Sequence, residues 1–271
     1  MIELTESMNL KRPSKGILEK YRVAVEDDSS FRANARTLQS IWRIEKFSDN
    51  FIGKDDRNRR DLGNMLPNKS VHRKGHNFLN ERITEIVMKA VDESKITGAK
   101  IAEPRIWNNL LSSQPLCFNL FAELSLRHEL AKKVFSQIFG VEIIKINGIT
   151  FEYSPGRRDI KYTSDKSAFD VFFDYESPKG RAFIGIEVKY SEDLKDEPSS
   201  HKERYEEITR ESMVFRPDVI EKLKRKPLQQ IWRDHLLALS LYKVNADYKK
   251  GLFVYLYPRD NIECIKLSKA I

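Results

Sequence analysis

Three side chains that could do chemistry together, those of Asp170, Glu187 and Lys189, lie in two neighbouring apolar segments. Glu187 and Lys189 are two residues apart, and a β-strand points residues i and i+2 to the same face. An adjacent strand carrying Asp170 would complete a cluster of two carboxylates and one ammonium group. Charged groups inside an apolar segment are costly unless they are paired or bind a metal, so this cluster is a candidate site.

The chemistry of this cluster is that of a divalent cation acting on a phosphate. The two carboxylates and the carbonyl of Val188 offer the hard oxygen ligands that Mg²⁺ prefers, with Mn²⁺ as a substitute. A bound ion polarises a phosphodiester and lowers the pKa of a bound water, and Lys189 would orient that water or stabilise negative charge. An ordinary ion pair between Glu187 and Lys189 is the alternative, and the upstream Asp170 favours the metal site over it.

The segments that carry these residues have the pattern of a β-hairpin. Phe169–Tyr175 and Ala182–Tyr190 are rich in aliphatic and aromatic residues, and a Pro-Lys-Gly turn at Pro178–Gly180 separates them. We therefore expect Asp170, near the start of the first strand, to lie beside Glu187, near the end of the second.

This pattern resembles a known family. Asp170, a strand-turn-strand interval and Glu187-Val188-Lys189 resemble the signature of the PD-(D/E)xK nuclease superfamily, with Phe169 in place of the proline. Three further segments are similar to its bacterial restriction-endonuclease-like branch: Lys189-Tyr190-Ser191-Glu192, Ser113–Phe121 and Gln229–Arg233. The resemblance covers roughly residues 30–257 and implies a metal-dependent phosphodiesterase fold, without fixing the substrate.

A long helical pattern over Gln114–Phe139 offers one more carboxylate. Apolar residues recur at helical spacing, and Pro115 suits the first turn. The resemblance implies that a helical Glu supplies another ligand to the metal, and Glu123 is the candidate. A surface pair between Glu123 and Arg127, four residues apart, is an equal alternative.

A second helix, expected over Leu228–Val244, follows the two site strands. The resemblance implies that a Gln or Arg on this helix approaches the substrate phosphate or the attacking water. Gln230 is the first candidate and Arg233 the second. Helix capping and solvation remain alternatives for both residues.

A polar, basic loop at residues 154–166 opens just before Asp170 and contains Arg157 and Arg158. Arginines beside a metal site could contact the phosphodiester backbone. We expect such contacts from Arg157 and Arg158, and the resemblance adds Arg233, so these three arginines are the candidates for binding nucleic acid.

The N-terminal third carries most of the positive charge. The formal net charge of the chain is +8, and the segment Lys11–Lys74 holds 16 Lys and Arg against 9 Asp and Glu, which accounts for +7. A basic region of this kind suits a polyanion. Mild basicity is also common in proteins that bind no nucleic acid, so charge alone favours it only slightly.

A helix is expected within this third, beginning at Ser29 or the next residue and continuing to about Lys46. Arg32, Arg36 and Arg43 lie largely off its apolar stripe. These arginines could lie along a DNA backbone, and an ordinary solvated face with salt bridges is at least as good an explanation.

Four further segments complete the order of elements: a helix at Asn77–Glu93, a strand pair over Val141–Tyr153 that turns at Asn147-Gly148, a buried strand at Gly251–Tyr257 and an edge strand at Ile262–Leu267. This order predicts an α/β fold with a mixed central β-sheet flanked by helices. We expect a restriction-endonuclease-like core at residues 113–271 and a helical, basic N-terminal extension at residues 1–112.

Composition limits the protein class. The 271 residues are 32% charged and 40% hydrophobic, which is typical of a globular protein. No apolar run reaches the length of a membrane span or of a secretory signal. Cys117 and Cys264 lie in apolar segments, so we expect core thiols and a cytoplasmic location. No Walker A motif or nucleophile elbow supports an ATP-driven or serine-hydrolase mechanism.

The sequence therefore predicts a Mg²⁺-dependent DNA endonuclease of the restriction or defence type, with RNA left open as a substrate. One alternative is a repair-type or structure-specific nuclease, including an exonuclease. The other is a nucleic-acid-binding protein with a catalytically silent nuclease-like core. A homodimer would suit double-strand cleavage of a palindrome.

Overall fold

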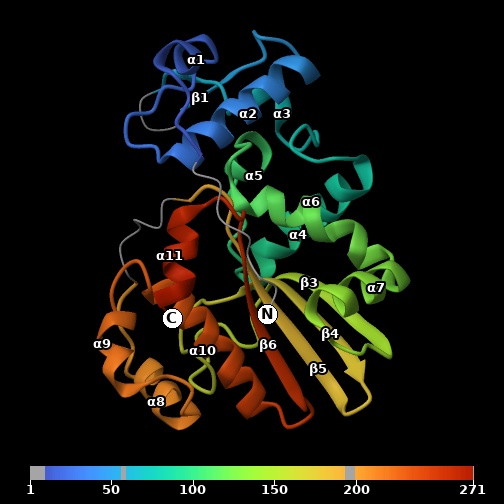
Figure 1. Cartoon of the computed structure of the whole chain (residues 1–271). Helices are drawn as coiled ribbons and strands as arrows, with labels where there is room; N and C mark the ends of the chain where they lie inside the picture. The colour runs from blue at the N-terminus through green and yellow to red at the C-terminus, as the bar shows by residue number, and fades with distance from the viewer. Residues whose placement is uncertain (1–9, 56–58, 193–198, 271) are drawn as a thin grey trace.

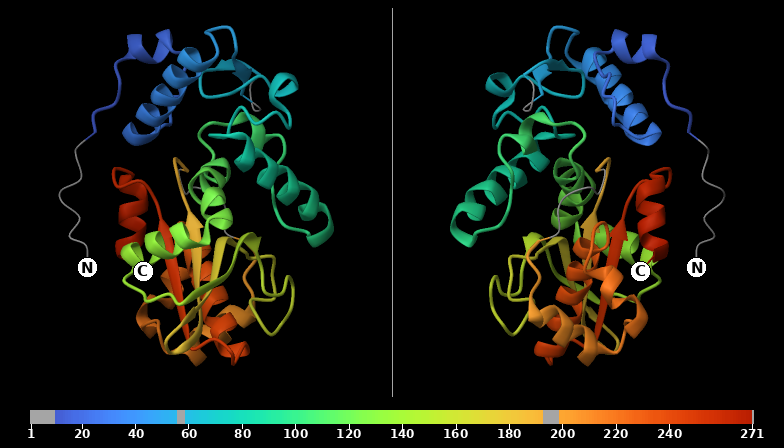
Figure 2. Two further views of the ribbon diagram at one scale, coloured as in Figure 1. Left: turned by 90° about the vertical axis from the view of Figure 1, so that its right-hand side faces the viewer. Right: turned by 90° about the vertical axis from the view of Figure 1, so that its left-hand side faces the viewer.

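The computed structural model describes residues 10–55, 59–192 and 199–270. A helical N-terminal part stands at one end of a four-stranded sheet that has helices on both faces (Figures 1 and 2). The N-terminal elements are α1 (Lys15–Lys20), α2 (Ser30–Lys46), β1 (Gly53–Lys54), β2 (Asp61–Leu62), α3 (Asn68–Val71), α4 (Glu81–Thr97) and α5 (Arg105–Asn108). None of the described helices combines the length and hydropathy needed to cross a lipid bilayer.

The sheet is mixed, as the sequence predicts. Its strands lie in chain order: β3 (Lys145–Tyr153), β4 (Phe169–Ser177), β5 (Gly180–Val188) and β6 (Lys250–Leu256). β4 pairs antiparallel with both β3 and β5, whereas β6 runs parallel to β5. The order of elements and the mixed sheet confirm the predicted α/β fold with a central sheet flanked by helices.

Two hydrophobic cores hold helices against the two faces of the sheet. One face packs on α6 (Ser113–Leu126) and α7 (His128–Phe139), where the rings of Phe135 and Phe173 stack at 4.1 Å. The other face packs on α10 (Gln229–Val244), which buries Leu237 and Leu241 against it. The remaining elements are α8 (Glu203–Ser212), η1 (Pro217–Val219), α9 (Ile220–Leu223) and α11 (Ile262–Ala270).

The hairpin of β4 and β5 has the predicted register. Val171 pairs with Ile186, so the next positions, Asp170 and Glu187, lie beside each other at the end of the sheet. Ile186 joins the core under α6 and α7. Because neighbouring residues of a strand face opposite ways, Glu187 is on the α10 face.

Two predicted strand assignments are wrong. Val141–Tyr153 contains one strand and no hairpin: Asn147 donates hydrogen bonds from its side chain to Asp174 and Glu176 of β4, and a register shift there absorbs an extra residue. Ile262–Leu267 lies in the helix α11, where the side-chain oxygen of Asn261 caps the first turn by accepting a hydrogen bond from the N–H of Cys264.

Three helix predictions hold with changed boundaries. The predicted helix over Gln114–Phe139 is interrupted at Arg127, which separates α6 from α7. The helix predicted at Asn77–Glu93 is α4, whose N-cap is Asn80 and which continues to Thr97. The predicted helix at Leu228–Val244 is confirmed as α10.

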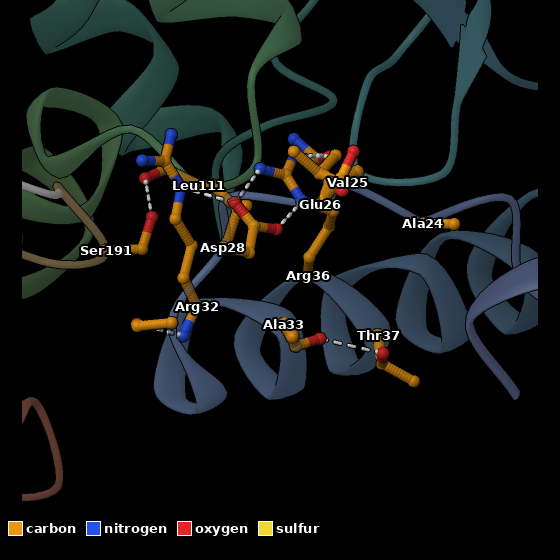
Figure 3. Close-up of polar contacts among 12 residues, drawn as sticks. Ala24, Val25, Glu26, Asp28, Arg32, Ala33, Arg36, Thr37, Leu111 and Ser191 are labelled. Atoms are coloured by element: carbon orange, nitrogen blue, oxygen red, sulfur yellow. Dashed lines mark hydrogen bonds and ion pairs between the residues drawn. The ribbon is translucent and has the colours of Figure 1, made fainter. Parts of the chain in front are cut away.

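The arginines of α2 form hydrogen bonds and ion pairs inside the N-terminal part. This corrects the expectation that they lie along a DNA backbone. Arg36 is buried and donates hydrogen bonds to both carboxylate oxygens of Asp28 (Figure 3). Arg43 is fully buried and donates to four loop carbonyls, those of Gly63, Ser48, Asp49 and Phe51. Arg32 forms an ion pair with Asp28 at 3.2 Å.

The N-terminal part and the sheet region share a core. Buried side chains such as Leu66, Ile83 and Trp107 pack in one cluster with Phe118 and Ala122 of α6. The predicted division into residues 1–112 and 113–271 remains a prediction.

Candidate active site

A cleft of about 420 Å³ lies where β4 begins and where β3 and β5 end. Its lining is densely charged. The acids are Glu152, Asp170, Glu187, Glu192 and Asp234, and the cations are Lys100, Arg105, Arg157, Lys166, Lys189, Lys226 and Arg233. The three residues singled out first in the sequence therefore share one cleft.

Asp170 is held by the strand that carries its partner. Its Oδ2 accepts a hydrogen bond of 2.7 Å from the backbone N–H of Val188, between Glu187 and Lys189. Burial raises the pKa of Asp170 well above its usual range, and the negative charges of Glu187 and Glu152 raise it further. Because these effects disfavour the charged form of Asp170, a cation bound nearby would stabilise its carboxylate.

Glu187 and Lys189 form a buried ion pair, with Nζ of Lys189 2.7 Å from Oε1 of Glu187. Only 5% of Glu187 and 7% of Lys189 is exposed. Gln230 of α10 donates a second hydrogen bond, of 2.9 Å, to the same oxygen. Although burial lowers the pKa of Lys189, the charges of Glu187 and Asp170 outweigh it and raise the pKa above its ordinary value. Lys189 is therefore an ammonium donor rather than a base.

The family follows from a comparison with known families. A model of the PD-(D/E)XK nuclease superfamily matches residues 26–271. The chain belongs to the PD-(D/E)XK nuclease superfamily. The match takes in the N-terminal part from α2 onward together with the sheet, and α1 lies before it. Neither the comparison with curated proteins nor the comparison with solved structures gave a match.

The divalent metal typical of PD-(D/E)XK nucleases fits the acids of the cleft. Asp170, Glu187 and the carbonyl of Val188 could hold it, and Asp234 adds a buried carboxylate oxygen with no hydrogen-bond partner in the described part of the chain. Among the described residues no three His, Cys, Asp or Glu side chains are grouped closely enough to surround an ion. Waters would therefore complete the shell, as is usual for Mg²⁺.

Glu123, the helical carboxylate proposed from the PD-(D/E)XK resemblance, does not reach the cleft. Its Oε1 accepts a hydrogen bond from Asn80, and its Oε2 lies 3.3 Å from Arg127. The N-terminal end of α6, at Ser113 and Gln114, lines the cleft. Glu123 is nine residues further along, about 13 Å at 1.5 Å per residue. The surface pair with Arg127 is what the structure shows.

Glu152 is an acid of the cleft that sequence reasoning missed. Its φ of +49° lies in the left-handed region, which is rare for a residue with a side chain. Phe151 before it stacks on Phe118 of α6, whereas Tyr153 after it stacks on Phe172, in the core under α10. The strand thus changes face at Glu152. Regular alternation gives no sign of such a change.

A glutamine fixes the carboxyl of Glu152 in the cleft. Gln114 donates a 2.6 Å hydrogen bond to Oε1 of Glu152 and another to the carbonyl of Lys100, and its own side-chain oxygen accepts from the N–H of Ala102. Burial raises the pKa of Glu152 to about 7, with the Gln114 hydrogen bond opposing the shift and Glu187 adding to it.

The three predicted nucleic-acid-binding arginines differ in position. Arg157 lines the cleft and donates hydrogen bonds to the carbonyls of Glu152 and Lys166. Arg233 also lines the cleft, but it forms an ion pair of 3.0 Å with Asp165. Arg158 is exposed and is not part of the cleft lining.

Proposed function

We propose that this PD-(D/E)XK protein is a Mg²⁺-dependent DNA endonuclease of the restriction or defence type, with Mn²⁺ as a working substitute. The observation that carries the proposal is the meeting of Asp170, Glu187 and Lys189 in one cleft, from two strands in hydrogen-bonded register. An ordinary structural ion pair would not need the third charged group or the additional acids around it.

Each residue of the site has a role in this proposal. Asp170, Glu187 and the Val188 carbonyl would hold the cation, which, when bound, polarises the phosphodiester and lowers the pKa of a water. Lys189 donates hydrogen bonds that orient the attacking water or stabilise negative charge on the phosphate. Gln230 holds the Glu187 carboxylate in place. Water attacks phosphorus in line with the leaving oxygen, without a covalent intermediate.

The restriction-type branch is supported by where the resembling segments lie. Glu192, just after the Glu-x-Lys strand, accepts hydrogen bonds from the N–H groups of Tyr190 and Ser113, and Ser113 begins α6. Gln230, from the third segment, reaches Glu187. The three stretches thus meet at one cleft. A cytoplasmic location, in keeping with the two free, buried cysteines, and a homodimer belong to the same proposal.

The direct test is incubation of the purified protein with circular plasmid, linear duplex and single-stranded DNA, each with Mg²⁺, Mn²⁺ or EDTA. Cleavage of the circle that requires the divalent ion is expected. Cleavage of linear DNA alone would indicate an exonuclease of the repair type. Salt-sensitive binding without cleavage under any ion would indicate a silent nucleic-acid-binding protein and would overturn the endonuclease proposal.

A further inference from the structure

Four of the cations that line the cleft come from two segments of the chain, and we call them the cationic wall: Lys100, Arg105, Arg157 and Lys166. Lys100 comes from the segment between α4 and α5 and Arg105 from the first residue of α5, whereas Arg157 and Lys166 come from the loop between β3 and β4. The two segments are in contact, because a Cβ placed at Gly98 would lie 4.0 Å from Cδ of Arg157. The wall therefore combines two segments that are distant in the sequence and close together at the cleft.

No side chain of the wall forms a close ion pair with a described acid, although the charges of Arg157 and Arg105 lower the pKa of Glu152 in the same cleft. In the described ranges of the chain, none of its four side chains lies within the 4.0 Å ion-pair distance of a carboxylate. Arg157 donates hydrogen bonds to two backbone carbonyls, which hold it in position without neutralising its charge. The other cations of the cleft contrast with this, since Lys189 is paired with Glu187 and Arg233 with Asp165.

Cations that line a cleft without close ion pairs attract a polyanion, because each phosphate they neutralise releases condensed counterions. The wall also lines the same cleft as Asp170 and Glu187. A DNA strand that placed one phosphate at those acids would present a neighbouring phosphate to the wall. Phosphate contacts of this kind set the position of the strand and carry no sequence information.

We propose that the cationic wall binds the backbone phosphates of the DNA strand being cut, next to the phosphate that is cleaved. This inference rests on the proposed nuclease function and adds the residues that position its substrate. It places the main backbone contacts in the cleft wall, and not on the arginines of α2, which are buried or paired within the N-terminal part.

The test is the salt dependence of DNA binding. A short fluorescent duplex of mixed sequence is titrated with full-length Asp170→Asn protein, which is expected not to cleave it, with and without Lys100→Gln, Arg105→Gln and Lys166→Gln together. Arg157 is left intact because it holds the loop. We expect the slope of log affinity against log salt to fall by about 3, since each phosphate contact contributes about 0.9 on duplex DNA.

A matched control removes the same charge elsewhere. Lys133, Lys145 and Lys179 are exposed and do not line the cleft. Their combined replacement by Gln should leave the slope within about 1 of the parent value. Equal slopes for the wall and control variants would overturn the inference. Thermal melts check that both variants fold; if the triple wall variant does not, each single substitution should lower the slope by about 1.

Plasmid cleavage by the protein with Asp170 intact, measured in parallel, separates the two proposals. Cleavage together with equal slopes would overturn the wall alone. A lower slope for the wall variant without any cleavage would overturn the nuclease proposal and leave the wall as a nucleic-acid-binding surface.

Discussion

At the scale of single residues, the site depends on charged side chains that share one cleft. The apolar surroundings of Asp170, Glu187 and Lys189 already indicate these three residues in the sequence, and the family resemblance adds Gln230. The structure brings the four together. Glu152 could not be predicted, since its approach to the cleft depends on one backbone angle. The prediction of Glu123 as a metal ligand is wrong because this residue lies too far along α6 from the cleft.

Glu152→Gln tests the unpredicted acid. Residues held in sparsely populated backbone conformations cluster at functional sites, so we expect the rate of DNA cleavage to fall about 10- to 100-fold, the usual effect of losing a group that supports a metal site. Glu123→Gln is the matched control and should cleave at the parental rate, because Glu123 contacts Asn80 and Arg127 outside the cleft. Equal rates for both variants would remove Glu152 from the site.

At the scale of elements, the hairpin was predictable because alternation, turn residues and register all agree within a short stretch. The course of β3 was not, since Asn-Gly usually marks a turn and only the side-chain contacts of Asn147 across to β4 show that the strand continues. The edge strand predicted at Ile262–Leu267 is a helix, because the pattern of a short apolar segment fits a strand and a helix equally well.

Gly185→Ala tests how the hairpin places Asp170. A Cβ at Gly185 would lie 2.5 Å from the buried ring of Phe169, the residue immediately before Asp170. We expect a loss of about 1–3 kcal/mol in the free energy of unfolding, measured with denaturant, together with slower cleavage. Gly148→Ala, where nothing lies within 4 Å, is the control in the same sheet. Parental stability and activity of the Gly185 variant would contradict this account.

Asp165 ties α8 and α10 to the loop before β4. It accepts hydrogen bonds from Tyr205, Thr163 and Ser167 and pairs with Arg233. Burial raises the pKa of Asp165, but hydrogen bonds from Tyr205 and Ser167 and the charge of Arg233 outweigh it and lower the pKa below its ordinary value of 3.8.

A pKa lower in the folded state means that Asp165 contributes stability above pH 3.8, and that this stability is lost as pH falls through the folded-state value. Asp165→Asn should therefore be less stable than the parent near neutral pH, with the difference shrinking below pH 3.8. Denaturant unfolding at several pH values measures this. A difference that stays constant down to the lowest pH would show that the charge of Asp165 has no part in it.

At the scale of the whole molecule, the N-terminal part contacts the segment that follows β5 and also packs against α6. Gln39 of α2 donates a 3.0 Å hydrogen bond to the hydroxyl of Tyr190, the residue after Lys189. The sequence showed how many arginines this part contains but not that several are internal, because one helical stripe does not reveal which loops fold over it.

Arg43→Ala tests this internal role. Removing a fully buried guanidinium leaves loop carbonyls without donors, so we expect a loss of about 3 kcal/mol in the free energy of unfolding. Lys46→Ala, on an exposed position of the same helix, should change it little. A variant that unfolds like the parent but binds DNA more weakly would restore the idea of an arginine face.

The most direct measurement of the central claim is the rate of Mg²⁺-dependent plasmid cleavage by Lys189→Ala beside Lys179→Ala, an exposed lysine in the turn of the same hairpin. We expect the first variant to be about 100- to 1000-fold slower, the usual loss when a donor to a charged transition state is removed, and the second to match the parent. A Lys189→Ala protein that is folded and cleaves at the parental rate would contradict the assignment of Asp170, Glu187 and Lys189 as the catalytic site.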